Sequence, residues 1–454
     1  SLQELAQTQR FRRLTAPLDP MFALLDGRTR FEVPPDVELF TREIEREYPQ
    51  VERAIAELYG VVSEVNGRID AAFERDAIWP PGTLWEKLET GRISNGLPLV
   101  EAGNEVPSIF ARFPSGHGFR RAVELPALFS SHLGLDESAL SPFSTVRLHG
   151  SWARGVQCLP KDEQEFEDFL IERIESHGGV CRLRDHASQL LVKRGRVVGI
   201  QEDGESWATG ADAVVTNVSG ETIADLALGA GITRKALTAW PEVKVVGGRF
   251  VVSLVVLRSG LPAALPRESF LVSPDPSLPT VHLKRGPSHD ADASREPTDT
   301  LVAEMLLPRA GSVHFLGARE AVLSTLRHYL PFLDDNSLVV DSPHDGLPAA
   351  IHERGPNGKR QKREIDRIHL KDTSTQPEAM EPRLVVHPPG YLGIAGEPIR
   401  GPILGTYLVG PSVLPALGQE GEVMAAWGAA RILTKKDRTR QKLRRQMWTK
   451  IETT

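Results

Sequence analysis

The sequence has few cysteines and no long apolar run, and each shortage excludes a class of protein. Only two of its 454 residues are cysteine, Cys158 and Cys181, which is too few for a disulfide framework. We expect both thiols to stay reduced in a cytoplasmic setting. No apolar run approaches the roughly 20 residues that span a bilayer, and residues 250–257, the longest, are typical of a buried strand. The start of the chain shows no signal-peptide pattern.

The chain also lacks a large excess of charge of one sign. Its net charge is −6, which argues against nucleic acid as a partner because such proteins carry basic surfaces. Apolar residues at 40% and charged residues at 25% are typical of a globular protein. A chain of 454 residues can bury the cores of two or three domains.

Several catalytic motifs are missing as well. The 13 histidines include no H-E-x-x-H and no tight cluster with aspartate, so we predict no metal site. Residues 150–155 have the wrong spacing for a nucleophile elbow, and no P-loop is present. Isolated histidines such as His149 and His282 are more often surface or core residues than bases. The sequence therefore assigns no catalytic residue.

The most informative stretch that is present runs from Gly405 to Leu433. Residues 407–409 are a short β-type run, and small and apolar residues at helical spacing begin at Gly421. Between them, glycine and proline recur at Gly410, Pro411, Pro415, Gly418 and Gly421. A strand, a glycine-rich loop and a helix N-terminus bring backbone N–H groups toward one point, which suits an anionic or electron-rich ligand. An ordinary strand–turn–helix explains the same spacing.

This stretch resembles the C-terminal flavin motif of the phytoene desaturase-like branch of the FAD-dependent amine oxidase superfamily, roughly G-x-Y-L-x-G-D-x-x-x-P-G-x-G-x-x-G. The matching residues are Gly405, Tyr407, Leu408, Gly410, Pro415, Gly418 and Gly421. Pro411 stands where the family usually has an acidic residue that helps to hold FAD, and Ala416 where it usually has glycine. The resemblance implies FAD as the cofactor, with these binding residues: Ala187, Gly410, Pro411, Ser412, Pro415, Gly418 and Gly421.

A second resemblance covers residues 151–228. The pattern predicts a helix at 162–176, β-type runs at 180–183, 188–192 and 197–202, and a buried strand at 213–217. This order resembles the middle segment of the family's FAD domain, in which Ala187 falls at a backbone contact to the adenine side of FAD. The family usually has Pro-x-Gly-Gly before the helix, whereas this chain has Pro-Lys-Asp-Glu at 160–163. Carboxylates there would disfavour a reduced, anionic flavin.

The family opens with a strand, a G-x-G-x-x-G turn and a helix that hold the ADP part of FAD. This chain has no such pattern, because Gly229-Ala-Gly231 lacks the third glycine. The chain starts with Ser1 rather than Met, so we expect a fragment, a processed form or a trimmed form. Either the missing unit lies upstream, or another chain carries it, or the protein works without it.

The rest of the chain resembles the substrate domain of the family. We expect a hairpin around Asp26-Gly27, helices from Val37 and from Pro49, and a helix at 119–133. Further along, we expect a strand pair at 243–257 that turns at Gly247-Gly248, a polar loop at 284–299, a strand at 301–307 and a helix at 318–330. The basic run at 359–363 is predicted to be an exposed loop.

The predicted fold class is α/β: a discontinuous, partly missing Rossmann-like FAD domain interleaved with a mixed-sheet and helical substrate domain. Its segments are the first part of the substrate domain at 1–150, the middle FAD segment at 151–228, the second part of the substrate domain at 229–385, the C-terminal FAD segment at 386–433 and a basic tail at 434–454.

The basic tail leaves two interpretations open. Residues 431–450 hold nine Lys or Arg against one Asp. The segment is either a helix on a membrane surface or a solvated terminal helix. The membrane interpretation suits a family whose substrates are often isoprenoid lipids.

Three functional hypotheses follow. The first is an FAD-dependent oxidoreductase resembling phytoene or carotenoid desaturases, which removes hydride from an apolar, isoprenoid-like small molecule or isomerises it. The second is a cofactor-free relative that acts as a binding subunit and completes its fold with a partner chain or a second copy. The third is a flavin amine oxidase; with aromatic residues at 6%, no aromatic cage for an amine can be assigned.

Overall fold

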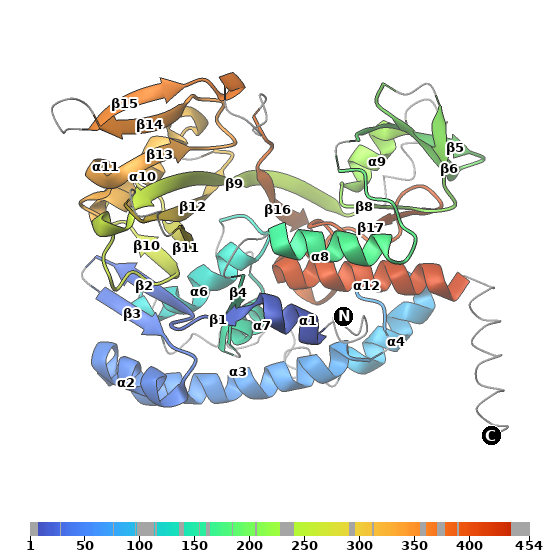
Figure 1. Cartoon of the computed structure of the whole chain (residues 1–454). Helices are drawn as coiled ribbons and strands as arrows, with labels where there is room; N and C mark the ends of the chain where they lie inside the picture. The colour runs from blue at the N-terminus through green and yellow to red at the C-terminus, as the bar shows by residue number, and fades with distance from the viewer. Residues whose placement is uncertain are drawn as a thin grey trace.

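A ten-stranded mixed sheet and a helical layer form most of the molecule, which is an α/β protein as predicted (Figure 1). The computed structural model describes residues 8–27, 29–75, 77–95, 97, 113, 116–135, 140–153, 155–159, 164–183, 185–204, 207–227, 240–289, 296–310, 313–354, 360–369, 377–387 and 390–436. Within these ranges, no helix combines the length and the apolar character needed to cross a membrane. The predicted division into domain segments stays a prediction.

The large sheet is arranged around one long strand, β9 (Glu242–Leu257). The strand order is β15-β14-β13-β9-β12-β11-β10-β2-β3, and β16 pairs with the first half of β9 on the same side as β13. The strands are β2 (Phe22–Asp26), β3 (Thr29–Val33), β10 (Glu268–Val272), β11 (Val281–His289), β12 (Thr298–Pro308), β13 (Ser337–Asp341), β14 (Ala349–Arg354), β15 (Arg360–Ile365) and β16 (Glu381–His387). The predicted hairpin at Asp26-Gly27 is confirmed as β2–β3.

The predicted turn at Gly247-Gly248 is wrong, because β9 runs straight through it. Gly247 pairs with Pro308 and Gly248 with Leu307 in a continuous antiparallel ladder. A Cβ atom on Gly247 would lie 2.3 Å from the Leu307 carbonyl oxygen, and one on Gly248 would lie 2.7 Å from the Cβ of Met380. The two glycines therefore permit a close approach of neighbouring chain segments.

Three further predictions are wrong for related reasons. Half of the predicted loop at 284–299 belongs to strands, with 284–289 in β11 and 298–299 in β12, and polar side chains pair across the ladder, as Arg285 does with Asp299. Residues 290–295 of that prediction lie outside the described ranges. The basic run at 359–363 is largely the edge strand β15, whose charged side chains suit an exposed sheet edge. Residues 180–183 form no strand.

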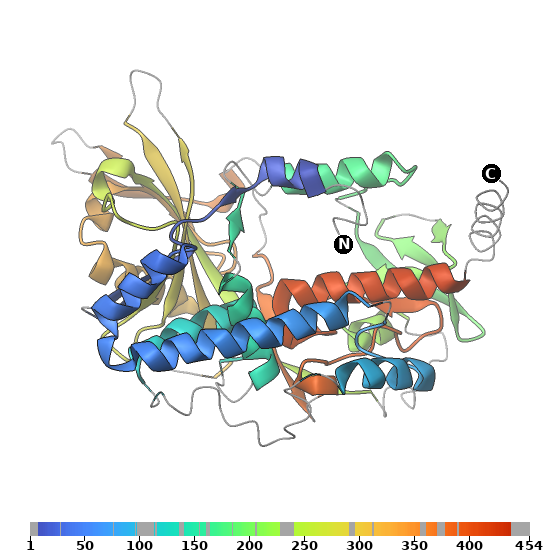
Figure 2. The same cartoon turned by 90° about the horizontal axis from the view of Figure 1, so that it is seen from below.

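Two helices cover one face of the sheet, and a larger group of helices packs on its other face and beside it (Figures 1 and 2). Phe250, Val252 and Leu254 of β9 alternate toward the first face and form a core with α10. The helices are α1 (Thr8–Leu14), α2 (Val37–Glu47), α3 (Glu52–Phe73), α4 (Leu84–Ser94), α6 (Gly118–Ser130), α7 (Pro142–Ala153), α8 (Gln164–Glu175), α9 (Gly220–Leu226), α10 (Ala318–Tyr329), α11 (Leu333–Asn336) and α12 (Gly418–Lys436). The predicted helices near 37, 49, 119 and 318 are confirmed.

Three small sheets complete the described part of the chain. Strand β8 (Val214–Thr216) pairs in parallel with β17 (Thr406–Leu408), which confirms the two predicted strands. Strands β5 (Ala187–Lys193), β6 (Arg196–Glu202) and β7 (Ala208–Gly210) form an antiparallel sheet. A short pair joins β1 (Ala16–Pro17) to β4 (Gln157–Cys158).

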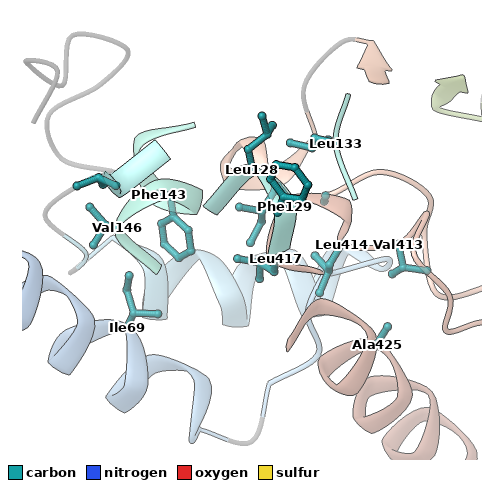
Figure 3. Close-up of a cluster of buried hydrophobic side chains, with 14 of the residues drawn as sticks. Ile69, Leu128, Phe129, Leu133, Phe143, Val146, Val413, Leu414, Leu417 and Ala425 are labelled. Atoms are coloured by element: carbon teal, nitrogen blue, oxygen red, sulfur yellow. The ribbon is translucent and has the colours of Figure 1, made fainter. Parts of the chain in front are cut away.

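The second core lies between α6, α7, α12 and the loop that precedes α12 (Figure 3). Leu128 and Phe129 of α6 and Leu417 of the loop are buried there, with Ala425 of α12 fully enclosed. This apolar layer holds the start of α12 against the end of α6.

A buried arginine connects this core to the sheet. Arg383 of β16 is 1% exposed and donates hydrogen bonds to the carbonyl oxygen of Leu128 at 2.6 Å and to that of Ser131. These carbonyls lie at the C-terminal end of α6, where no further helical turn supplies backbone N–H donors for them. Burial and the nearby charge of Arg249 lower the pKa of Arg383 to about 9.

We predict that Arg383→Ala destabilises the fold by about 3–5 kcal/mol, because it removes the donor to the Ser131 carbonyl, weakens the pairing of the Leu128 carbonyl and opens a cavity. Urea denaturation gives the free energy of unfolding. Arg53→Ala is the control, since the Arg53 side chain is 93% exposed, and we expect a change within about 0.5 kcal/mol. Equal losses in the two variants would contradict the capping role of Arg383.

Candidate active site

The strand–loop–helix predicted near the end of the chain is confirmed. After β17, the loop passes through a 3₁₀ turn, η9 (Pro415–Leu417), and α12 begins at Gly418. The helix thus starts three residues earlier than Gly421, where the sequence pattern placed it. Gly418 has φ +55°, a left-handed conformation that glycine adopts without strain.

The loop glycines lie against other parts of the backbone. A Cβ atom on Gly410 would lie 2.2 Å from the Asn217 carbonyl oxygen, and one on Gly418 would lie 1.8 Å from that of Ser130. On Gly421 it would lie 2.3 Å from the Leu414 carbonyl oxygen. Glycine at these positions therefore lets chain segments touch each other.

The structure brings six of the seven predicted cofactor residues together in this loop and at the start of α12. They are Gly410, Pro411, Ser412, Pro415, Gly418 and Gly421. The seventh, Ala187, is exposed at the start of β5 and pairs with Glu202 in a different sheet. Their role in binding FAD stays a prediction.

A cavity of 480 Å³ opens where the start of α12 faces the sheet. We call it the charged cavity. Phe129, Leu148, Trp152 and Leu417 provide apolar and aromatic wall. Its charged lining comes from the segment after α6, from strands β9, β10, β11 and β16, and from α12. The charged lining residues are His132, Arg249, Glu268, His282, Lys284, Glu381, Glu420 and Glu422.

On the sheet side, these charges alternate across neighbouring strands. Glu304 of β12 lies directly opposite His282 of β11, and its two oxygens are 2.7 Å from Lys284 Nζ and 2.9 Å from an Arg249 nitrogen. His282 Nε2 lies 2.6 Å from Glu268 on β10. Opposite charges on adjacent strands attract, so this arrangement is stable despite its burial.

The same series continues to α12 through His132. Arg249 Nε lies 2.9 Å from Glu381, whose other oxygen is 2.5 Å from His132 Nδ1. The second ring nitrogen of His132 lies 2.9 Å from Glu422 at the start of α12. Eight residues thus form one connected set, which we call the ionic chain: Glu268, His282, Glu304, Lys284, Arg249, Glu381, His132 and Glu422.

Protonation in the ionic chain follows from its pairing. Burial alone would lower the pKa of His132, but its contacts with Glu381 and Glu422 outweigh burial and raise it. The pKa of His282 is raised in the same way, against burial, by Glu268 and Glu304. Burial would raise the pKa of Glu304, but its cationic neighbours hold it well below the usual range. The two histidines are therefore favoured as cations and Glu304 as an anion.

A second buried arginine positions the start of α12. The Arg147 side chain of α7 lies 2.7 Å from Asp70 of α3 and, through Nε, 2.7 Å from Glu420 of α12. Burial would lower the pKa of Arg147, but Glu420 and Asp70 raise it. Glu420 is thereby held at the edge of the charged cavity.

An apolar cavity, also of 480 Å³, lies on the other side of a thin wall. The wall is made of residues 131–133 and 415–417, joined by a 2.7 Å hydrogen bond from the His132 N–H to the Pro415 carbonyl. The lining is mostly aliphatic and includes Leu133, Leu135, Val246, Leu384, Val386, Ile394 and Ala416. The loop before α12 thus contacts both cavities.

Sequence reasoning missed most of this site. His282 is a buried core residue, in line with the prediction, and it also lines the charged cavity, which the sequence did not indicate. His149 is a core residue as predicted: it is 2% exposed, pairs with Tyr59 at 2.7 Å, and burial lowers its pKa to about 4. One signal in the sequence could have indicated the charged cavity. Polar residues at alternate positions, such as His282 and Lys284 of β11, lie on the same face of a strand.

The described residues fit FAD only in part. Ser412 Oγ and a side-chain oxygen of Glu397 are buried without a hydrogen-bond partner, and the Glu397 N–H donates to the Ser412 carbonyl at 2.8 Å. Such polar atoms suit a ligand at this loop. The sequence has no G-x-G-x-x-G turn for the ADP part, however, and residues 160–163, where crowding of the flavin was predicted, lie outside the described ranges. We therefore derive no catalytic step through a flavin.

The comparisons with known proteins identify the fold. No protein-family model and no curated protein matches the sequence. An oxidoreductase from Methanosarcina mazei is similar in structure, with a TM-score of 0.52 and 12% identity over 95% of this chain and 85% of that one. Cyclohexylamine oxidase from Brevibacterium oxydans aligns with a TM-score of 0.43 and 12% identity, over 94% and 85% of the two chains. Rab GDI from Plasmodium falciparum aligns with a TM-score of 0.37 and 10% identity, over 75% and 71%.

We predict that Gly418→Ala destabilises the protein by more than about 2 kcal/mol, because it adds strain at positive φ and a clash with Ser130. Thermal or urea unfolding measures the loss. Gly60→Ala in α3 is the matched control, since a Cβ atom there meets nothing within 4 Å; alanine in a helix should stabilise by up to about 1 kcal/mol. A neutral Gly418→Ala would show that the contact with α6 can relax.

We also predict a pH-dependent contribution from His132. The pKa of His132 in the folded state lies above the ordinary value of 6.5. The stabilisation of the fold by His132 is therefore fully present below pH 6.5, and it is lost as the pH rises through the folded-state pKa. About 1.4 kcal/mol is lost for each unit of pKa elevation. The measurement is the difference in unfolding free energy between the wild type and His132→Asn from pH 5 to 9. A difference that does not change with pH would contradict a cationic His132.

Proposed function

We propose that this chain is an FAD-dependent oxidoreductase and that the charged cavity holds the reacting end of its substrate. The observation that carries the proposal is the ionic chain at the start of α12, in a fold similar to that of an oxidoreductase. Clusters of perturbed acids and bases in a cavity are typical of catalytic sites. FAD, when bound, would supply the hydride acceptor.

The side chains of the ionic chain suit proton transfer to and from a substrate. The most accessible members are Glu422, Glu381 and Lys284, with side chains 41%, 37% and 34% exposed, whereas the side chains of His132 and Arg249 are 5% and 15% exposed. In the proposal, Glu422 accepts a proton from the substrate, and the cation of His132 at 2.9 Å orients its carboxylate. Lys284 holds an anionic group or donates a proton.

The two cavities suit different substrates. A hydrocarbon in the charged cavity would remove water from several ions without replacing its hydrogen bonds. The charged cavity instead favours a polar substrate such as an amine, for which Phe129 and Trp152 offer aromatic walls. An isoprenoid-like substrate of a phytoene or carotenoid desaturase would fit the apolar cavity. We favour the polar substrate because the acids and bases line the charged cavity.

A second candidate function is that of a binding subunit which completes its fold with a partner chain. Within the described residues, β8 and β17 form a two-stranded parallel sheet, with Val215 48% exposed, and α12 exposes Val423 at 50%. Parallel sheets are normally buried on both faces. A strand–turn–helix unit with the missing glycine motif would cover these residues and hold the ADP part of FAD.

The deciding experiment is the visible absorption spectrum of the purified chain before and after incubation with FAD, repeated on the supernatant after denaturation. The proposal predicts a flavin spectrum and near-stoichiometric release, because the loop before α12 then suffices to hold FAD. A protein that stays colourless at FAD concentrations well above the micromolar range would rule out the oxidoreductase for this chain alone. It would favour the second candidate, for which chromatography would then detect a partner or a second copy.

A further inference from the structure

The charged cavity carries an excess of positive charge on its sheet side and of negative charge on its α12 side. On the sheet side, Glu304 touches three cations of β9 and β11, and Glu268 adds a second carboxylate. On the α12 side, His132 lies between one carboxylate of β16 and one of α12. A further carboxylate on this side, that of Glu420, is paired with a buried arginine. A ligand with unlike charges at its two ends is therefore attracted in one orientation.

Two of these charged groups keep hydrogen-bonding capacity for a ligand. The Lys284 ammonium has three N–H donors, and its bond to Glu304, at 2.7 Å, is the one hydrogen bond it forms within the described residues. The Glu422 carboxylate contacts His132 through one oxygen, at 2.9 Å. Both side chains line the cavity and are 34% and 41% exposed. Lys284 can therefore donate to an anionic group, and the second oxygen of Glu422 can accept from a cationic one.

A substrate with a single charge leaves one side of the cavity unmatched. An amine placed at Glu422 satisfies the carboxylates near α12 but is repelled by the cations of the sheet. A carboxylate placed at Lys284 is repelled from the α12 side for the same reason. A molecule with both groups forms a charge-assisted hydrogen bond at each end without bringing like charges together. Phe129 and Trp152 provide an apolar wall for the rest of such a molecule.

We infer that the charged cavity selects a zwitterion, a molecule that carries an ammonium group and a carboxylate on one apolar body. Lys284 sets this specificity because it binds the carboxylate, and Glu422 receives the ammonium group. The inference rests on the proposed function, since it narrows the polar substrate of the same cavity to one chemical class. Selection by Lys284 precedes any reaction, so it is measurable as binding without turnover.

Isothermal titration calorimetry on the full chain, as purified and after incubation with FAD, tests the inference. The three probes share a phenyl ring: phenylalanine carries both charges, 2-phenylethylamine lacks the carboxylate, and 3-phenylpropionate lacks the ammonium group. We expect phenylalanine to bind about tenfold more tightly than either single-charge probe, because it forms one more charge-assisted hydrogen bond. Equal affinities for phenylalanine and 2-phenylethylamine would overturn the inference, and so would a lack of phenylalanine binding.

Substitution of Lys284 shows which group of the ligand it binds. Lys284→Met should weaken phenylalanine binding about tenfold and leave 2-phenylethylamine binding unchanged, whereas Lys284→Arg keeps the charge and should retain the preference for phenylalanine. Lys244→Met is the matched control, since Lys244 also lies on a strand and pairs with a glutamate at 2.6 Å, but outside the cavity. An equal loss of both ligands in Lys284→Met would contradict a contact with the carboxylate. Urea denaturation shows that each variant folds, and the comparison of probes on the wild type decides the inference if Lys284→Met does not.

The result is separable from the test of the proposed function. A chain that binds FAD but does not distinguish phenylalanine from 2-phenylethylamine refutes the zwitterion and leaves the oxidoreductase in place. A chain that stays colourless with FAD but prefers phenylalanine, and loses this preference in Lys284→Met, refutes the oxidoreductase and supports the zwitterion site.

Discussion

The buried cation of Arg383 is the interaction on which the site depends most. It is one of the largest fully enclosed side chains, and it binds the end of α6 to β16. The end of α6 in turn contacts Gly418, and residues 131–133, which follow it directly, form part of the wall between the two cavities. A shift of α6 away from the sheet would take the hydrogen-bond acceptors from this guanidinium while leaving it buried. Such a shift is opposed because an unpaired buried charge is costly.

Close to Arg383, the alternating positive and negative side chains of the ionic chain line a polar cavity inside an otherwise apolar region. Each buried carboxylate of the ionic chain touches at least one cation, and Glu304 touches three. Each ion of the set thus has an opposite charge beside it, which offsets part of the cost of burying it. It also keeps the accessible side chains of Glu422 and Lys284 next to partners that orient them.

The sequence was informative where the determinant is local. Asp26-Gly27 predicted the first hairpin, and glycine-bounded apolar runs predicted β8 and β17. The sequence was misleading where the structure of a segment depends on a contact with residues far away in the chain. Gly247 resembles a turn residue until Leu307 is seen against it, and Lys284 resembles a loop residue until Glu304 is placed opposite. The ionic chain joins residues from six separate elements, so no local pattern marks it as one site. The fold class was predictable; the charged cavity was not.

The parallel pairing of β2 with β10 has a consequence for the order in which this protein is made. Ala23 and Leu24 take their places beside Ser269 and Phe270. At a synthesis rate of about 5–20 residues per second, the first hairpin leaves the ribosome on the order of ten to fifty seconds before its neighbour exists. During that interval, Phe22, Leu24 and Phe31, all fully buried in the finished protein, lack their final cover. The apolar side chains of the first hairpin therefore stay exposed on the nascent chain until β10 has been synthesised and can pair with β2.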